Sequence, residues 1–173
     1  MSAAPPAPPP ETPGGSLLAV DVGLRTGLAL YGRDGRLRWY RSQHWPDRAR
    51  MRRAVHGLLR AIDDLEWVAV EGGGPLAEIW AREAARRGAG VLTVAAEQWR
   101  TALLWPRERR TGPGAKRHAG PLARRVIEWS GAPKPTSLRH DAAEAILVGL
   151  WAVWRVGWLP RLPAGLGRAS PAG

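Results

Sequence analysis

The chain has 173 residues, no cysteine and a formal net charge of +11, from 26 basic and 15 acidic residues. A chain of this length is expected to form one domain with a substantial core. The missing cysteines exclude disulfides and thiolate-bound zinc, so any metal ion must be held by oxygen or histidine. The positive charge favours binding to a polyanion, with nucleic acid as the first candidate and an anionic membrane as the second. A GC-rich genome would account for much of the bias, because 24 of the basic residues are arginine.

Both ends of the chain are expected to lie outside the folded domain. Residues 1–15 hold six of the sixteen prolines and no apolar periodicity, which predicts a disordered, polyproline-like tail. Residues 16–159 are predicted to form the domain, and residues 160–173 a second disordered tail. The early prolines leave no room for a secretory signal, and the apolar segment Ala145–Trp154 is too short to span a bilayer. A cytoplasmic protein without membrane attachment is therefore expected.

The first half of the domain is organised around Leu17–Tyr31. Its apolar run ends on Asp21, a glycine-containing turn follows, and a second apolar run completes a strand-turn-strand pattern. An Asp-Gly turn and the loosely alternating segment Arg36–His44 predict a third antiparallel strand. A helix capped by Asp47 is expected to continue through Arg60.

The second half predicts a parallel crossover beside this meander, and so an α/β domain. Strand Trp67–Glu71 also ends on an acid, and a helix and the apolar strand Val91–Ala95 follow it. The segment Pro106–Gly120 is basic and is expected to be the least ordered internal stretch. The predicted helices of this half are Leu76–Arg87, Ala96–Leu104, Leu122–Trp129 and Ser137–Trp154.

Four acids stand at informative positions. Asp21 and Glu71 end two apolar strands, and adjacent parallel strands would bring them side by side. Asp141 and Glu144 are spaced i, i+3 near the start of the last helix, which places them on one helical face. Each acid also has a structural explanation, as a strand-end, capping or first-turn residue. Four carboxylates together would need counter-charge, which two divalent cations roughly 3.5–4 Å apart can supply during phosphoryl transfer.

Three motifs resemble the RuvC-type Holliday-junction resolvases. They are V-D-V-G-L-R-T-G-L-A-L, V-A-V-E and H-D-A-A-E-A-I-L-V-G, in that order, and the resemblance covers about Leu17 to Ala152. The stretch E-Q-W-R-T-A-L-L and the basic, glycine-containing segment after it resemble phage-type members. The resemblance implies an RNase H-like fold, with a five-stranded mixed sheet of three antiparallel and then two parallel strands and helices on both faces. It also implies a homodimer that cuts four-way DNA junctions with Mg²⁺ or Mn²⁺, two ions per site, and no small-molecule cofactor.

The same resemblance assigns the site residues. Asp21, Glu71, Asp141 and Glu144 match the family's catalytic, metal-binding acids, and Lys116 resembles a basic residue near the scissile phosphate. The sequence departs from the family at Glu144, where many members have Asp, and at Val22, where many have Pro. A further catalytic candidate is His140, because some relatives use a histidine on this helix. The basic residues expected to contact DNA are Arg100, Arg107, Arg109, Arg110, Lys116 and Arg117.

Two alternative functions stay open at this point. Other RNase H-fold nucleases, including YqgF-type proteins that begin with a similar D-V-G turn, act on RNA or branched DNA. Glu71 and H-D-A-A-E argue against the YqgF type, which lacks the later glutamate. A basic nucleic-acid-binding protein with purely structural acids is the non-enzymatic alternative. Metal-dependent nicking of DNA would separate an enzyme from such a binder.

Overall fold

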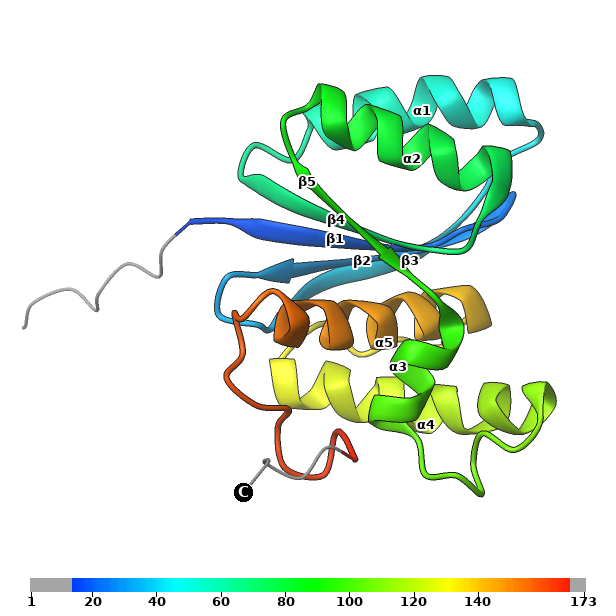
Figure 1. Ribbon diagram of the computed structural model, residues 1–173, viewed down its shortest axis with the longest axis vertical. Coiled ribbons are helices and arrows are strands. Elements are labelled where there is room, and N and C mark those ends of the chain that lie inside the picture. The colour runs from blue at the N-terminus through cyan, green and yellow to red at the C-terminus, as the bar shows by residue number, and fades with distance from the viewer. Residues whose placement is uncertain (1–13, 169–173) are drawn as a thin grey trace, which may run out of the picture.

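Five strands form one mixed sheet in the order β3-β2-β1-β4-β5 (Figure 1). The computed structural model describes residues 14–168. An antiparallel meander is followed by two strands that continue from β1 in parallel. The strands are β1 (Ser16–Asp21), β2 (Arg25–Gly32), β3 (Leu37–His44), β4 (Leu65–Glu71) and β5 (Gly90–Val94). This arrangement confirms the predicted three antiparallel and two parallel strands.

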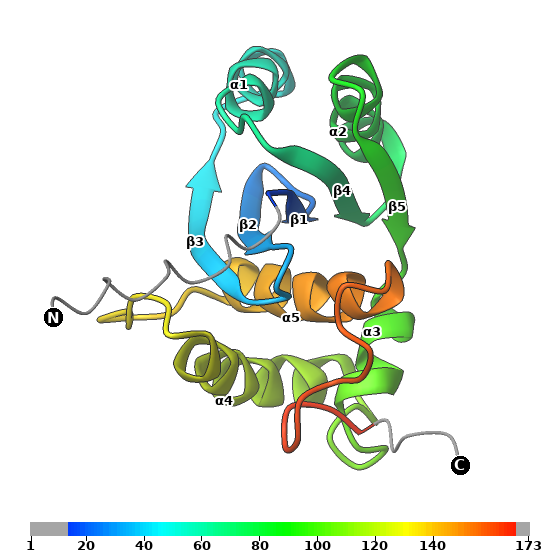
Figure 2. The same cartoon turned by 90° about the vertical axis from the view of Figure 1, so that its left-hand side faces the viewer.

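Helices cover both faces of the sheet, as the α/β prediction required (Figure 2). One face carries α1 (Arg48–Arg60) and α2 (Gly74–Arg86). The other face carries α5 (His140–Arg155), with α4 (Gly112–Ser130) packed behind it and α3 (Ala96–Leu103) after β5. The topology is RNase H-like.

The alternation of side chains along β1 decides where its terminal acid points. Leu17 and Ala19 pack into the core on the α5 side, whereas Leu18 and Val20 pack under α1 and α2. Both faces are buried, which explains why the strand reads as a continuous apolar run. With a period of two, Asp21 falls on the α5 side of the sheet.

Helix α5 approaches the sheet closely because glycines stand at two contact points. A Cβ at Gly27 of β2 would lie 1.8 Å from the carbonyl oxygen of Asp141, so only glycine fits under the first turn of α5. A Cβ at Gly149 would lie 2.2 Å from the ring of Tyr31, whose hydroxyl donates to the carbonyl of Ile146. These contacts lay the start of α5 over the carboxyl ends of β1 and β4.

Helix α4 begins ten residues before the predicted start at Leu122. Thr111 caps it, and its hydroxyl accepts a hydrogen bond from the Gly114 amide at 3.0 Å. Pro121 lies inside the helix, where proline removes a backbone hydrogen bond. A long buried face packed near α5 outweighs that cost, formed by Ala115, Ala119, Leu122, Ala123, Val126 and Ile127. Lys116 therefore lies on a helix. The predicted least ordered stretch, Pro106–Gly120, lacks a helix or strand only up to Thr111, so the prediction was wrong from Gly112 onward.

The C-terminal boundary of the folded part also lies later than predicted. Leu162 and Leu166 are buried in the core on the α5 side, and the Arg168 amide donates to the Ala102 carbonyl at 2.9 Å. Residues 160–168 are thus packed onto the domain, because two leucines supply apolar contacts. The rest of the predicted tails, 1–13 and 169–173, lies outside the described residues. Within residues 14–168, no helix combines the length and apolar character needed to cross a membrane.

Candidate functional site

The parallel pairing of β1 and β4 places their terminal acids side by side. Asp21 and Glu71 are direct partners in the register, and the Val22 amide donates to the Glu71 carbonyl at 3.1 Å. Ala69 packs on the α5 side, so Glu71 two residues later faces the same side as Asp21. The predicted juxtaposition of the two strand-end acids is confirmed.

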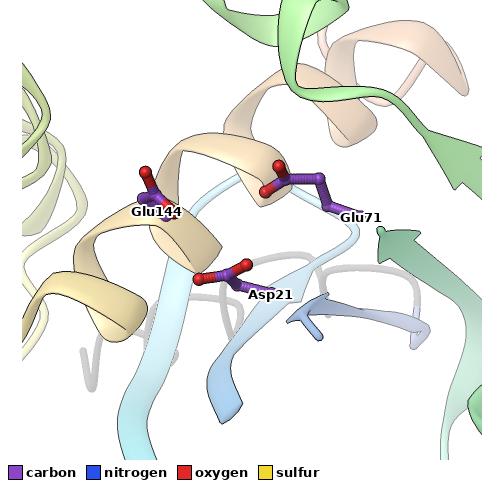
Figure 3. Close-up of side chains that lie close together, drawn as sticks. All are labelled: Asp21, Glu71 and Glu144. Atoms are coloured by element: carbon purple, nitrogen blue, oxygen red, sulfur yellow. The ribbon is translucent and has the colours of Figure 1, made fainter. Parts of the chain in front are cut away.

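Helix α5 adds a third carboxylate to this pair. Glu144 lies one turn into the helix, and its side chain reaches toward Asp21 and Glu71 (Figure 3). One ligand oxygen from each of the three acids lies within 4.8 Å of the others. Glu71 and Glu144 are buried and Asp21 is half-buried. We call these three residues the acid cluster.

Asp141, the fourth predicted acid, lies beside the acid cluster rather than in it. Its Oδ2 accepts a hydrogen bond from the Ser42 hydroxyl on β3, and its Oδ1 accepts from the Ala142 amide at 3.0 Å. It still lines the same cavity as Asp21 and Glu144. The i, i+3 spacing therefore placed both helix acids in one cavity, while the hydrogen bond from Ser42 of β3 holds the Asp141 carboxylate apart from the other three.

Burial and mutual repulsion raise the pKa values of the cluster. The pKa of Asp21 rises to about 9, first because the side chain is buried and then because Glu71, Glu144 and Asp141 lie nearby. The pKa of Glu71 rises to about 7, again mainly through burial and then through Glu144, although Arg100 and the Trp99 indole act against the rise. Without a positive ligand, the fold therefore favours protonated carboxyl groups here.

One fully buried oxygen of the acid cluster has no hydrogen-bond partner among residues 14–168. Glu71 Oε2 is buried without a hydrogen bond, and so is the indole nitrogen of Trp99, although that indole lies close enough to affect the Glu71 carboxylate. A buried polar atom without a partner costs about 1–3 kcal/mol. Three converging carboxylates with a free oxygen and no sulfur ligand suit a hard divalent cation such as Mg²⁺ or Mn²⁺. The acid cluster could therefore bind metal ions.

Basic side chains surround the acids. A cavity of about 400 Å³ opens beside the cluster, and we call it the acid cavity. Lys116 reaches it from α4, in agreement with its predicted place near the site. The cavity is lined by Asp21, Arg25, Lys116, Arg139, His140, Asp141 and Glu144.

Sequence reasoning did not identify two of these cations, Arg25 and Arg139. Arg25 begins β2 just after the turn that follows Asp21, and Arg139 directly precedes α5. Both are exposed at the cavity. Their proximity in sequence to the acidic motifs was the available signal. His140 is exposed in the same cavity, and its catalytic role stays a prediction.

Two of the arginines expected to contact DNA are engaged within the protein. Arg100 Nη2 lies 3.5 Å from Glu144 Oε1, and its buried Nε has no hydrogen-bond partner in the described part of the chain. Arg109 Nη1 lies 2.8 Å from Glu97 Oε1. The other expected contacts, Arg107, Arg110, Lys116 and Arg117, are exposed. Their binding to DNA stays a prediction.

Neither the comparison with protein-family models nor the search of curated proteins gives a match. The fold and the acid cluster are thus the grounds for a functional assignment.

Proposed function

We propose that the protein is a metal-dependent endonuclease of the RuvC type that cuts phosphodiester bonds at four-way DNA junctions. The observation that carries the proposal is the convergence of Asp21, Glu71 and Glu144 within 4.8 Å at the carboxyl ends of β1 and β4. The RNase H-like topology and the three motifs that resemble the RuvC type support it.

The acid cluster would hold the metal, two Mg²⁺ or Mn²⁺ ions per site. Ions bound there neutralise charge on the phosphate and activate it as Lewis acids during hydrolysis. Glu71 offers an oxygen that no group of the described residues hydrogen-bonds, and Glu144 and Asp21 offer theirs from α5 and β1. Asp141, fixed by Ser42, would complete the acidic side of the cavity.

The basic residues of the acid cavity would bind and orient the scissile phosphate. Lys116, Arg25 and Arg139 are exposed and converge on the cavity from three different elements. A cation aimed at the developing charge stabilises the transition state more than the bound substrate. Lys116 is the residue we assign to that role.

The DNA partner and the oligomeric state follow from the proposed reaction. A net charge of +11 attracts a polyanion. Paired cuts related by a dyad need two equal active sites, and a symmetric homodimer would provide them.

The decisive experiment compares four substrates. Purified protein is incubated with a synthetic four-way junction, linear duplex, single strand and RNA–DNA hybrid, each with Mg²⁺, Mn²⁺ or EDTA. We expect symmetric paired cuts in the junction only with metal, and none from the Asp21→Asn variant. Preferred cleavage of the hybrid would indicate a different RNase H-fold nuclease. Binding without cleavage of any substrate would indicate a non-catalytic binder.

A further inference from the structure

Helices α1 and α2 lie side by side on the face opposite α5 (Figures 1 and 2). Helix α1 follows β3, whose end pairs with the start of β2, and α2 begins three residues after Glu71. Both helices therefore start at the edge of the sheet that carries the acid cluster and run away from it.

Two adjoining hollows follow the junction of these helices. Their volumes are about 380 and 330 Å³, and Glu83 and Arg86 line both of them. We call the combined hollow the arginine groove. Its charged lining residues are Arg48, Arg52, Arg60, Glu78, Arg82, Glu83, Arg86 and Arg87.

The two glutamates of the groove are already neutralised. Glu83 is buried; its Oε1 accepts from Arg86 at 2.7 Å and its Oε2 lies 3.0 Å from His56 Nδ1. These contacts, first the one from His56, lower the pKa of Glu83. Glu78 lies 3.5 Å from Arg82.

The arginines that α1 contributes to the groove have no partner among residues 14–168, whereas Arg50 of the same helix lies 3.8 Å from Asp47. Within residues 14–168, Arg48, Arg52 and Arg60 form neither an ion pair nor a side-chain hydrogen bond, and all three are exposed. Arg87 instead donates to the carbonyls of Leu59 and Ile62 at the end of α1. The groove therefore carries a row of positive charge along α1 that no protein group balances.

We propose that the arginine groove binds the sugar-phosphate backbone of DNA, as a second contact surface separate from the acid cavity. Guanidinium groups bind phosphate in a bidentate manner, and the three free arginines offer that geometry. Helix α1 has 13 residues, so the groove is about 20 Å long, which matches roughly six base pairs along a duplex axis.

The choice of DNA rests on the proposed function, and the position of the groove agrees with it. Because the groove starts near the edge that carries the acid cluster, an arm of a branched substrate held at the acid cavity can continue along it. Contacts on both faces of the sheet would then hold two arms of a junction, whereas a linear duplex would use one surface at a time.

Neighbouring residues on α1 supply the test. Arg52 lines the groove, whereas Arg53 is also exposed on the same helix but does not line it. Arg52→Ala, Arg53→Ala and the triple Arg48→Ala/Arg52→Ala/Arg60→Ala variant are compared with the unaltered protein. Affinity for a labelled linear duplex and for a synthetic four-way junction is measured in EDTA, between about 50 and 200 mM salt. EDTA removes cleavage from the measurement.

We expect Arg52→Ala to lower the slope of log K against log salt by about 0.9, the value for one lost phosphate contact. Arg53→Ala should leave the slope nearly unchanged, and the triple variant should lower it most on the junction. Equal slopes for Arg52→Ala and Arg53→Ala would overturn the inference. A changed oligomeric state with unchanged DNA affinity would also overturn it, by making the groove a protein interface. Absent cleavage by the unaltered protein, with the slopes still different, would reject the proposed function alone.

Discussion

Two buried glutamates, Glu71 and Glu83, lie in opposite electrostatic environments. Glu71 is 8% exposed and Glu83 is 7% exposed. Contacts from His56 and Arg86 lower the pKa of Glu83. Within residues 14–168, one oxygen of Glu71 has no hydrogen-bond partner, and the pKa of Glu71 rises to about 7. A carboxylate that only stabilises a fold is paired in this way. The unpaired carboxylate in a group of three is the one that suits a ligand.

The two faces of the sheet also differ in the charge of the side chains they carry. The acids gather under α5 at the carboxyl ends of β1 and β4, where burial discourages ionisation. The arginine groove lies on the opposite face, where its acids are neutralised and its α1 arginines are free. The first region suits cations and the second suits anions. A protein that hydrolyses a polyanion with metal ions needs both.

The largest expected effect separates the two glutamates by activity. Glu71→Gln should reduce metal-dependent cleavage of the junction by more than about 10³-fold, because it removes a ligand of the ions that drive the reaction. Glu83→Gln should leave the cleavage rate within about twofold of the unaltered protein. Single-turnover cleavage at saturating protein measures both variants.

Junction affinity in EDTA serves as the control for Glu71→Gln. We expect it to be unchanged or tighter, since the substitution removes negative charge near the phosphates. A loss of affinity in proportion to the loss of cleavage would make Glu71 a structural residue. Equal losses of cleavage in Glu71→Gln and Glu83→Gln would remove the distinction between the two sites.

The sequence predicted the parts of the site that depend on local pattern. Asp21 and Glu71 were identified because each ends an apolar strand, and parallel pairing then fixes their proximity. The position of Asp141 was less predictable, because it depends on a hydrogen bond to Ser42, 99 residues away. The start of α4 was mispredicted because glycines and Pro121 disfavour a helix, while packing near α5 outweighs that local preference.

The arginine groove shows the same limit. The exposed arginines of α1 are visible in the sequence as one helical face. The other wall of the groove is α2, which follows β4 in the sequence. Only the packed structure shows that Arg82 and Arg86 share the hollow with Arg48 and Arg52. Without that pairing, an arginine-rich face is indistinguishable from a solvated one.

A second, smaller effect concerns Lys116 in the acid cavity. Lys116→Ala should lower the single-turnover cleavage rate by roughly 10²–10³-fold, with a much smaller loss of junction affinity, because the contact stabilises charge in the transition state. Arg124→Ala is the control, since Arg124 is an exposed residue of the same helix that lies outside the cavity lining and outside the expected DNA contacts. A reduced affinity with an unchanged saturated rate would make Lys116 a binding residue only.

Metal binding should also distinguish the two glutamates without any substrate. Mn²⁺ at about 100 times its dissociation constant should stabilise the fold by about 2.7 kcal/mol. That corresponds to a rise in Tm of several degrees, since about 1 kcal/mol shifts Tm by roughly 2–4 °C for a domain of this size. The rise should vanish in Glu71→Gln and persist in Glu83→Gln, as measured by thermal unfolding with and without Mn²⁺. An equal rise in both variants would place the ion elsewhere.

The last expected effect is the pH dependence of stability in EDTA, compared between the unaltered protein and Asp21→Asn. The pKa of Asp21 is about 9 in the folded protein and 3.8 in the ordinary side chain, so between these values the folded state holds a proton that the unfolded state has lost. Stability is therefore greatest below the lower value and falls as pH rises toward 9, by at most about 1.4 kcal/mol per pH unit for one proton. Asparagine carries no such proton, so the free energy of unfolding of Asp21→Asn should fall less steeply with pH. The difference in free energy of unfolding in favour of the variant, measured from urea unfolding curves, should grow from pH 5 to pH 9.

Glu83 contributes in the opposite sense, because its lowered pKa stabilises the fold above its ordinary pKa of 4.5 and that contribution is lost only in acid. If the free energies of unfolding of the two proteins changed in parallel between pH 5 and 9, Asp21 would already be ionised in the folded protein. The acid cluster would then not stay protonated in the absence of a metal ion.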